Sequence, residues 1–114
     1  MTYFDGEAGG DLRTAFESLV DEWPDVDATT MFGCPSYRAD GTLFAVLVTE
    51  GVVLTRLPPD QRAQLAAAFE AEPFQAGDRT VTSWVQVPVD DATLGPLVPY
   101  VEASYETARA EGEP

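Results

Sequence analysis

Residues 31 to 57 constrain the fold most, because three β-rich runs follow one another there. Asp40-Gly41 separates the first run from the apolar run 43–48, and Asp-Gly is typical of a type I′ turn, whose two central residues need positive φ. Glu50-Gly51 gives a weaker turn signal before the run 52–57. The stretch therefore predicts a three-stranded antiparallel meander.

The strands of this meander differ in character. The first, expected from about 29 to 39, is interrupted by Gly33-Cys34-Pro35, which predicts a bulge in a bent edge strand. The second and third are apolar on both faces, and such strands are usually covered on both sides. A helix layer supplies one cover, and a partner subunit or a folded-over element supplies the other. This is the sequence's main indication of a homodimer.

The rest of the chain predicts three helices and two further strands. The first helix has Asp11 as its cap and stops before Pro24, with apolar side chains on one face and polar ones, among them Glu17 and Asp21, on the other. The remaining elements are a second helix opened by Pro58-Pro59-Asp60 and ended before Pro73, a short strand at 74–75, a strand over 80–87 and a helix from about 96 to 110.

The element order α-β(3)-α-β(2)-α indicates the α+β class, with one antiparallel sheet and helices packed mainly on one face. A length of 114 residues fits one domain. We expect a flexible N-terminal arm at 1–10, a single domain at 11–110 and a frayed tail at 111–114.

The charge is strongly unbalanced: 20 acidic residues face 6 arginines, with no lysine or histidine, for a net charge of −14. Such a surface predicts a halophilic protein, since the Debye length falls to about 3 Å at 1 M salt and screens the self-repulsion. The alternative is an acidic protein from a mesophile. DNA binding by this domain alone is unlikely, because it needs a basic footprint.

Location and redox context follow from what the chain lacks. No apolar run approaches a membrane span, so we expect no membrane association, and the first ten residues contain no basic residue of a secretory signal. The single cysteine excludes an internal disulfide, which suits the cytoplasm.

Catalytic chemistry has few candidates. Cys34 is a possible reactive thiol, but an active thiol needs a lowered pKa, and no histidine exists to pair with it. The alternative is a small buried hydrophobic residue. One cysteine without histidine cannot build a zinc site, and the acidic pairs lack calcium-loop spacing. We therefore expect no enzyme and no catalytic, cofactor-binding or metal residues.

A ligand or interaction surface is the remaining option. Strand residues of the types that line recognition sites are Tyr37, Arg38, Arg56 and Trp84. The alternative is that Trp84 belongs to the core and the arginines form surface salt bridges.

Several short motifs, in this order and spacing, resemble the TfoX N-terminal domain family and the related MmcQ/YjbR-like domains. They are Met31-Phe32-Gly33, Asp40-Gly41, Phe44-Ala45, Gly51 before Leu54, Phe74, Trp84, Pro88 and Ser104-Tyr105. The resemblance implies the fold α-β(3)-α-β(2)-α and a regulatory or protein-interaction role. Because the chain ends at Pro114, we expect a stand-alone domain without the C-terminal domain of full regulators of DNA-uptake competence. The alternative function is a small-ligand-binding or cryptic enzymatic domain using the four residues above.

Overall fold

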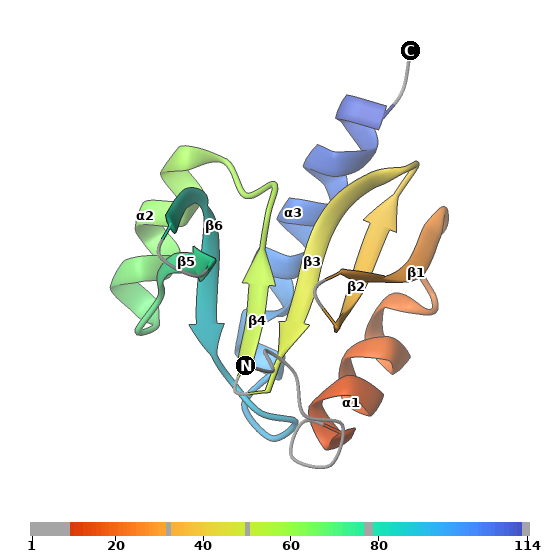
Figure 1. Ribbon diagram of the computed structural model, residues 1–114, viewed down its shortest axis with the longest axis horizontal. Coiled ribbons are helices and arrows are strands. Elements are labelled where there is room, and N and C mark those ends of the chain that lie inside the picture. Colours follow the sequence, from red (N-terminus) through yellow and green to blue (C-terminus); the bar gives the residue numbers. More distant parts are fainter. Residues whose placement is uncertain (1–9, 32, 50, 77–78, 113–114) are drawn as a thin grey trace.

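The computed structural model describes residues 10–31, 33–49, 51–76 and 79–112. Its strands form one antiparallel sheet in the order β1-β2-β3-β4-β6-β5, which confirms the predicted α+β class (Figure 1). In chain order the elements are α1 (Gly10–Val20), β1 (Val26–Met31), β2 (Cys34–Ala39), β3 (Thr42–Val48), β4 (Gly51–Leu54), α2 (Pro59–Ala68), β5 (Glu72–Ala76), β6 (Arg79–Pro88), a 3-10 turn η1 (Gly95–Leu97) and α3 (Val98–Gly112).

The predicted first strand is in fact two strands, which is a correction to the meander. Met31 pairs with Cys34, so β1 and β2 form a hairpin joined by residues 32–33. Gly33 has φ 75°, a left-handed conformation that reverses the chain there instead of bulging one strand. Residue 32 itself lies outside the described part of the chain. At this side of the sheet the edge strand is therefore β1, and β2 lies inside it.

The two glycine signals after β2 have different outcomes. Asp40 and Gly41 have φ 50° and 82°, as a two-residue primed turn requires, and this prediction is confirmed. Gly51 instead opens β4 opposite Val48, so the connection lies at 49–50, of which residue 50 is outside the described residues. A Cβ at position 51 would collide with the carbonyl oxygen of Val87, so this glycine allows a close approach of β4 and β6.

The first and third helices both pack against the sheet, and they meet at Trp23. The Tyr37 ring of β2 lies 4.9 Å from the Phe16 ring of α1, whereas the Phe44 ring of β3 lies 5.5 Å from the Tyr105 ring of α3. Trp23, just after α1, lies 6.5 Å from the Phe44 ring and 4.8 Å from the Tyr105 ring. In Figure 1, α3 passes behind β3.

The second helix, α2, packs beside α3. The rings of Phe69, just after α2, and Tyr100 of α3 lie 6.1 Å apart. Two of the three helices therefore lie side by side, as the prediction of helices mainly on one face requires.

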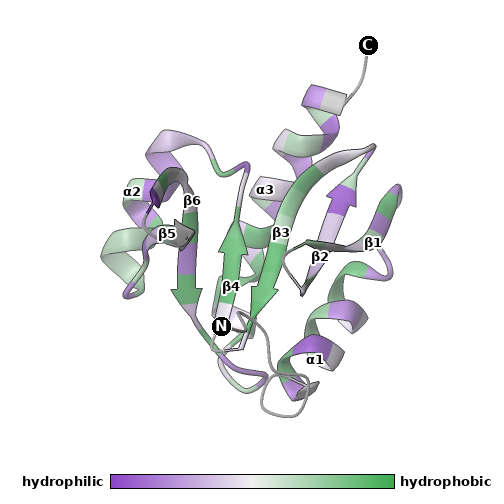
Figure 2. Cartoon of the chain, viewed as in Figure 1, coloured by the Kyte–Doolittle hydropathy of each residue, from purple (hydrophilic) through white to green (hydrophobic). Residues whose placement is uncertain are grey.

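The central strands are covered within a single chain. Every residue of β4, and residues 44–48 of β3, are buried, and Figure 2 shows both strands as the most hydrophobic part of the fold. Their two-sided apolar pattern therefore needs no partner subunit to explain it. The homodimer therefore stays a prediction, and the apolar pattern of the central strands no longer supports it.

The ends of the chain bear on the predicted boundaries. Helix α1 begins at Gly10, and the rest of the predicted arm lies outside the described residues. Helix α3 continues to Gly112, two residues into the predicted tail, whose last two residues are also outside the described part. No helix in the described ranges is long and apolar enough to cross a membrane.

Candidate functional site

The four residues proposed as one surface are not brought together. Trp84 lies on β6, three strands away from Tyr37 and Arg38 on β2. Arg56 follows the end of β4, two strands away from β2.

Tyr37 is a core residue that fastens α1 to β2. It is 1 % exposed, and its hydroxyl donates a 2.8 Å hydrogen bond to Glu17 Oε2. Burial and the bond to this carboxylate raise the pKa of Tyr37. Its phenol is therefore held neutral and bonded inside the fold.

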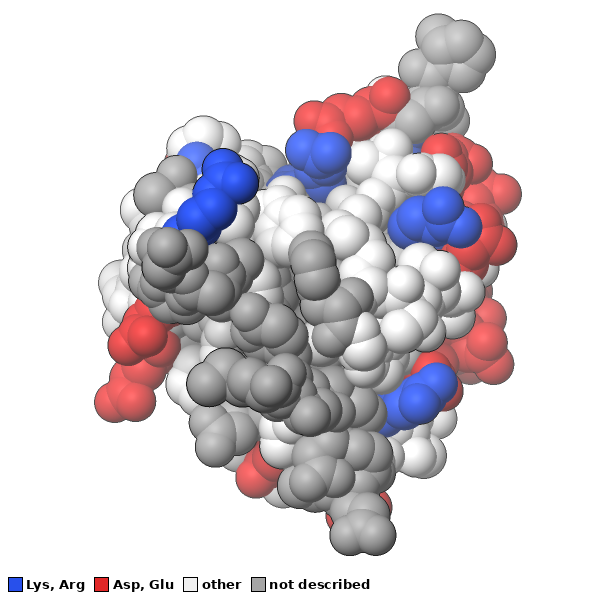
Figure 3. All heavy atoms as spheres, viewed as in Figure 1, with Lys and Arg blue, Asp and Glu red and all other residues white. Residues whose placement is uncertain are grey.

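Trp84 and Arg38 have separate surroundings. The Trp84 ring lies 5.8 Å from the Phe74 ring and is half-buried on the core. Arg38 follows a register shift in β2 and is exposed, and no described residue forms an ion pair with it. On the face drawn in Figure 3 the arginines lie apart from one another, with no continuous basic patch among the described residues.

Cys34 is a poor nucleophile in this setting. It is 2 % exposed at the start of β2, opposite Met31, and burial raises the pKa of its thiol. A raised pKa lowers the thiolate population, which is the reactive form. The thiol has the environment of a small apolar residue.

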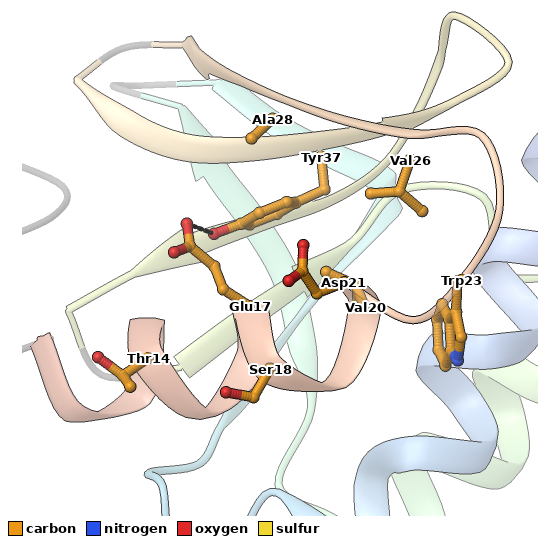
Figure 4. A pocket seen from close by; sticks show the side chains of 9 residues that line it. All are labelled: Thr14, Glu17, Ser18, Val20, Asp21, Trp23, Val26, Ala28 and Tyr37. Atoms are coloured by element: carbon orange, nitrogen blue, oxygen red, sulfur yellow. Dashed lines mark hydrogen bonds between the residues drawn. The ribbon is translucent and has the colours of Figure 1, made fainter.

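A hollow lined by acidic and apolar side chains lies between α1 and the β1–β2 hairpin, and we call it the α1–β1 groove (Figure 4). Its volume is about 430 Å³. The lining residues are Thr14, Glu17, Ser18, Val20, Asp21, Trp23, Val26, Ala28 and Tyr37. Two carboxylates come from Glu17 of α1 and from Asp21 just after it, and the hairpin contributes an apolar wall.

The two carboxylates differ in how they are used. Glu17 accepts bonds from Tyr37 and from Arg13, whose Nε lies 3.2 Å from Glu17 Oε2. Asp21 is exposed and forms no ion pair with a described residue. The groove therefore has negative charge available at one end.

Strand β1 forms one wall of this groove and is also the outermost strand of the sheet. It pairs with β2 on one side, and no other described strand pairs with its outer edge. Its six residues contain one charge, Asp27, and no proline. An edge strand with so little protection is a template for a further strand.

Arg56 lies at a second hollow, of about 320 Å³, beside Arg62. Its Nε forms a 3.1 Å ion pair with Glu111 Oε2, and its backbone N–H donates to the Ser104 hydroxyl at 3.1 Å. Arg56 therefore forms a surface salt bridge, as the alternative to a ligand contact expected.

Sequence reasoning missed the groove because it placed Glu17 and Asp21 on the solvent side of the first helix. Their spacing of four residues puts both carboxylates in one column of that helix, and this signal was available. The position of β1 beside these two carboxylates could not be predicted, because the pattern around Gly33 indicated a bulge and not a hairpin.

Comparison with known proteins gives one match. A family model described as the TfoX N-terminal domain matches residues 18–108. No curated protein and no solved structure matches the chain. The matched range spans the sheet and contributes residues to both walls of the α1–β1 groove. The chain belongs to the TfoX N-terminal domain family.

Proposed function

We propose that this chain is a non-enzymatic regulatory or protein-interaction domain that binds an extended, basic segment of a partner protein along β1. The observation that carries the proposal is the open edge of β1 beside the acidic α1–β1 groove. Strand addition to a sheet edge gives affinity through main-chain hydrogen bonds and specificity through alternate side chains.

The spacing of groups on the two walls supports this mode. Val26 and Ala28 line the groove, so side chains at alternate positions of β1 point to it. A strand added beside β1 would direct every second side chain to the same side, about 6.6 Å apart. Glu17 and Asp21 are about 6 Å apart along the helix axis. Two alternate lysines or arginines therefore match the two carboxylates.

Charge favours a basic partner over a second copy. Pairing two copies through β1 would bring Glu17, Asp21 and Asp27 of both chains together, in a molecule of net charge −14. A basic segment instead relieves this repulsion. The homodimer is the competing occupant, and light scattering on the free protein measures it.

A non-catalytic role is supported by the residues themselves. The chain contains no histidine, and its one thiol is buried with a raised pKa. The original form of the ligand-binding alternative is not supported, because Tyr37 is buried in the core and Trp84 lies three strands away on β6. Of the four residues in it, Arg56 lies at a hollow that holds a second arginine.

The test is a titration of the protein with a fluorescent peptide of alternating lysine and valine, followed by anisotropy at low and at molar KCl. We expect saturable binding that Asp21→Asn weakens about three- to tenfold, which corresponds to about 0.7–1.4 kcal/mol. Asp91→Asn is the matched control, because it removes the same charge from an exposed turn.

A second arm tests strand addition. N-methylation of alternate peptide amides removes main-chain donors and keeps every side-chain charge. We expect one of the two N-methylated registers to lose binding, because only one set of amides faces β1. Equal effects of Asp21→Asn and Asp91→Asn, or full binding by both N-methylated peptides, would contradict the proposal.

A further inference from the structure

The second hollow gathers positive charge in a protein that has little of it. It lies where β4 ends, α2 begins and α3 finishes, and we call it the Arg56–Arg62 hollow. Two of the chain's six arginines line it, in a chain that has 20 acidic residues. The other lining residues are Thr55, Leu57, Pro58, Pro59, Ser83, Thr107 and Glu111.

Arg62 has most of its hydrogen-bonding capacity unused. A guanidinium carries five N–H donors. The Arg62 guanidinium makes one long bond, 3.4 Å from Nη1 to the Leu57 carbonyl oxygen, and no ion pair with a described residue. Its side chain is half-buried and lines the hollow.

The other arginine, Arg56, forms an ion pair with Glu111. Its carboxylate lies 3.1 Å from Arg56 Nε, and both side chains are about half exposed. It sits in the last turn of α3, one residue before the helix ends. An exposed ion pair of this kind contributes little to stability and exchanges easily with another anion.

We propose that the Arg56–Arg62 hollow is a binding site for an oxyanion group, phosphate or carboxylate, of a small ligand, and that the Glu111 carboxylate holds the place of that group when the site is free. Two arginine forks suit phosphate and carboxylate because both accept paired N–H bonds.

The rest of the wall fits this assignment. Ser83 is exposed on β6, and its hydroxyl makes no hydrogen bond within the described ranges, whereas the Thr55 and Thr107 hydroxyls donate to the Leu43 and Ala103 carbonyl oxygens. Leu57, Pro58 and Pro59 form an apolar side for the carbon part of the ligand. The net charge of −14 repels anions at long range, so binding here requires short-range contacts.

The test is an amide chemical-shift titration of the labelled protein with inorganic phosphate and, separately, with acetate, at ionic strength fixed by KCl. We expect saturable shifts at Ser83 and Thr107 with at least one of the two anions. Saturation by phosphate identifies a tetrahedral group, and saturation by acetate identifies a carboxylate. Arg62→Gln should weaken binding at least about tenfold, because charge-assisted bonds are lost. Arg38→Gln is the matched control, an exposed arginine on β2.

A second variant does not depend on removing an arginine. Glu111→Gln should tighten binding several-fold, because it removes the carboxylate that competes for Arg56. Glu102→Gln makes the same charge change about 13 Å earlier on the same helix and should not. The proposal is overturned if neither anion saturates, if Glu111→Gln and Glu102→Gln act equally, or if Arg62→Gln and Arg38→Gln act equally. None of these outcomes affects peptide binding at β1, which lies on another part of the sheet.

Discussion

At the scale of single residues, the predicted and the observed role differ most for Tyr37. Sequence pattern placed it on a recognition surface, because a strand tyrosine suits either a core or a binding site. The first helix decides the matter, since the Phe16 ring lies 4.9 Å from the Tyr37 ring and Glu17 accepts a hydrogen bond from the Tyr37 hydroxyl. Pattern alone does not reveal this, because it depends on how α1 packs against β2.

The Tyr37 phenol makes stability depend on alkaline pH. Burial and the bond to Glu17 raise its pKa above the unfolded value of about 10. A raised folded pKa means that the contribution is complete below pH about 10 and is lost as pH rises through the folded pKa. We therefore expect the urea midpoint to fall above pH about 10.

Tyr37→Phe is the control for this effect. At pH 8 it should be less stable by about 1 kcal/mol, because one hydrogen bond is missing. The urea midpoint of this variant should fall less steeply above pH about 10 than that of the wild type. It should still fall, because burial also raises the pKa of Tyr105. A decline as steep as that of the wild type would show that Tyr37 is not responsible.

At the scale of elements, local signals predicted most of what is seen. The Asp-Gly turn, the proline-opened second helix and the alternating strand of β6 follow from residue chemistry that acts within a few positions. The β1–β2 hairpin was missed, because Gly33 is flanked by Cys34 and Pro35 and reads equally as a bulge. The edge strand, and with it the groove, depends on that one residue's backbone.

Ser104 fastens α3 to the sheet. Its hydroxyl donates a 2.7 Å bond to the Phe44 carbonyl oxygen and accepts from the Arg56 N–H, and the residue is fully buried. Ser104→Ala should destabilise by about 1–3 kcal/mol, because a buried N–H loses its acceptor.

Chemical denaturation measures this change. Ser18→Ala, on the exposed face of α1, is the matched control and should lie within about 0.5 kcal/mol of the wild type. If both variants unfold at the same urea concentration, the Ser104 bonds do not fasten the helix.

At the scale of the whole molecule, fold class and family could be predicted, and the candidate sites could not. Hydrophobic periodicity specifies the elements, and their order leaves few arrangements. The groove and the Arg56–Arg62 hollow depend on distant segments: Arg56 meets Glu111 from the far end of the chain. Such contacts have no local pattern in one sequence.

The net charge predicts a salt response for the molecule as a whole. We expect the urea midpoint to rise as KCl increases from about 0.1 to 2 M, because screening reduces repulsion among uncompensated carboxylates. The three ion pairs between described residues are each at least partly exposed, so the loss of stability from their weakening by salt should be smaller than this gain. A midpoint that is unchanged or lower at 2 M would remove the inference of a halophilic protein.

The most direct test of the central claim is amide hydrogen exchange of the protein with and without the alternating lysine–valine peptide. If the peptide adds a strand, the outward-facing amides of β1 should exchange at least about tenfold more slowly in the complex, with β5, the opposite edge, unchanged. Protection that is absent from β1, or equal at β1 and β5, would contradict the account.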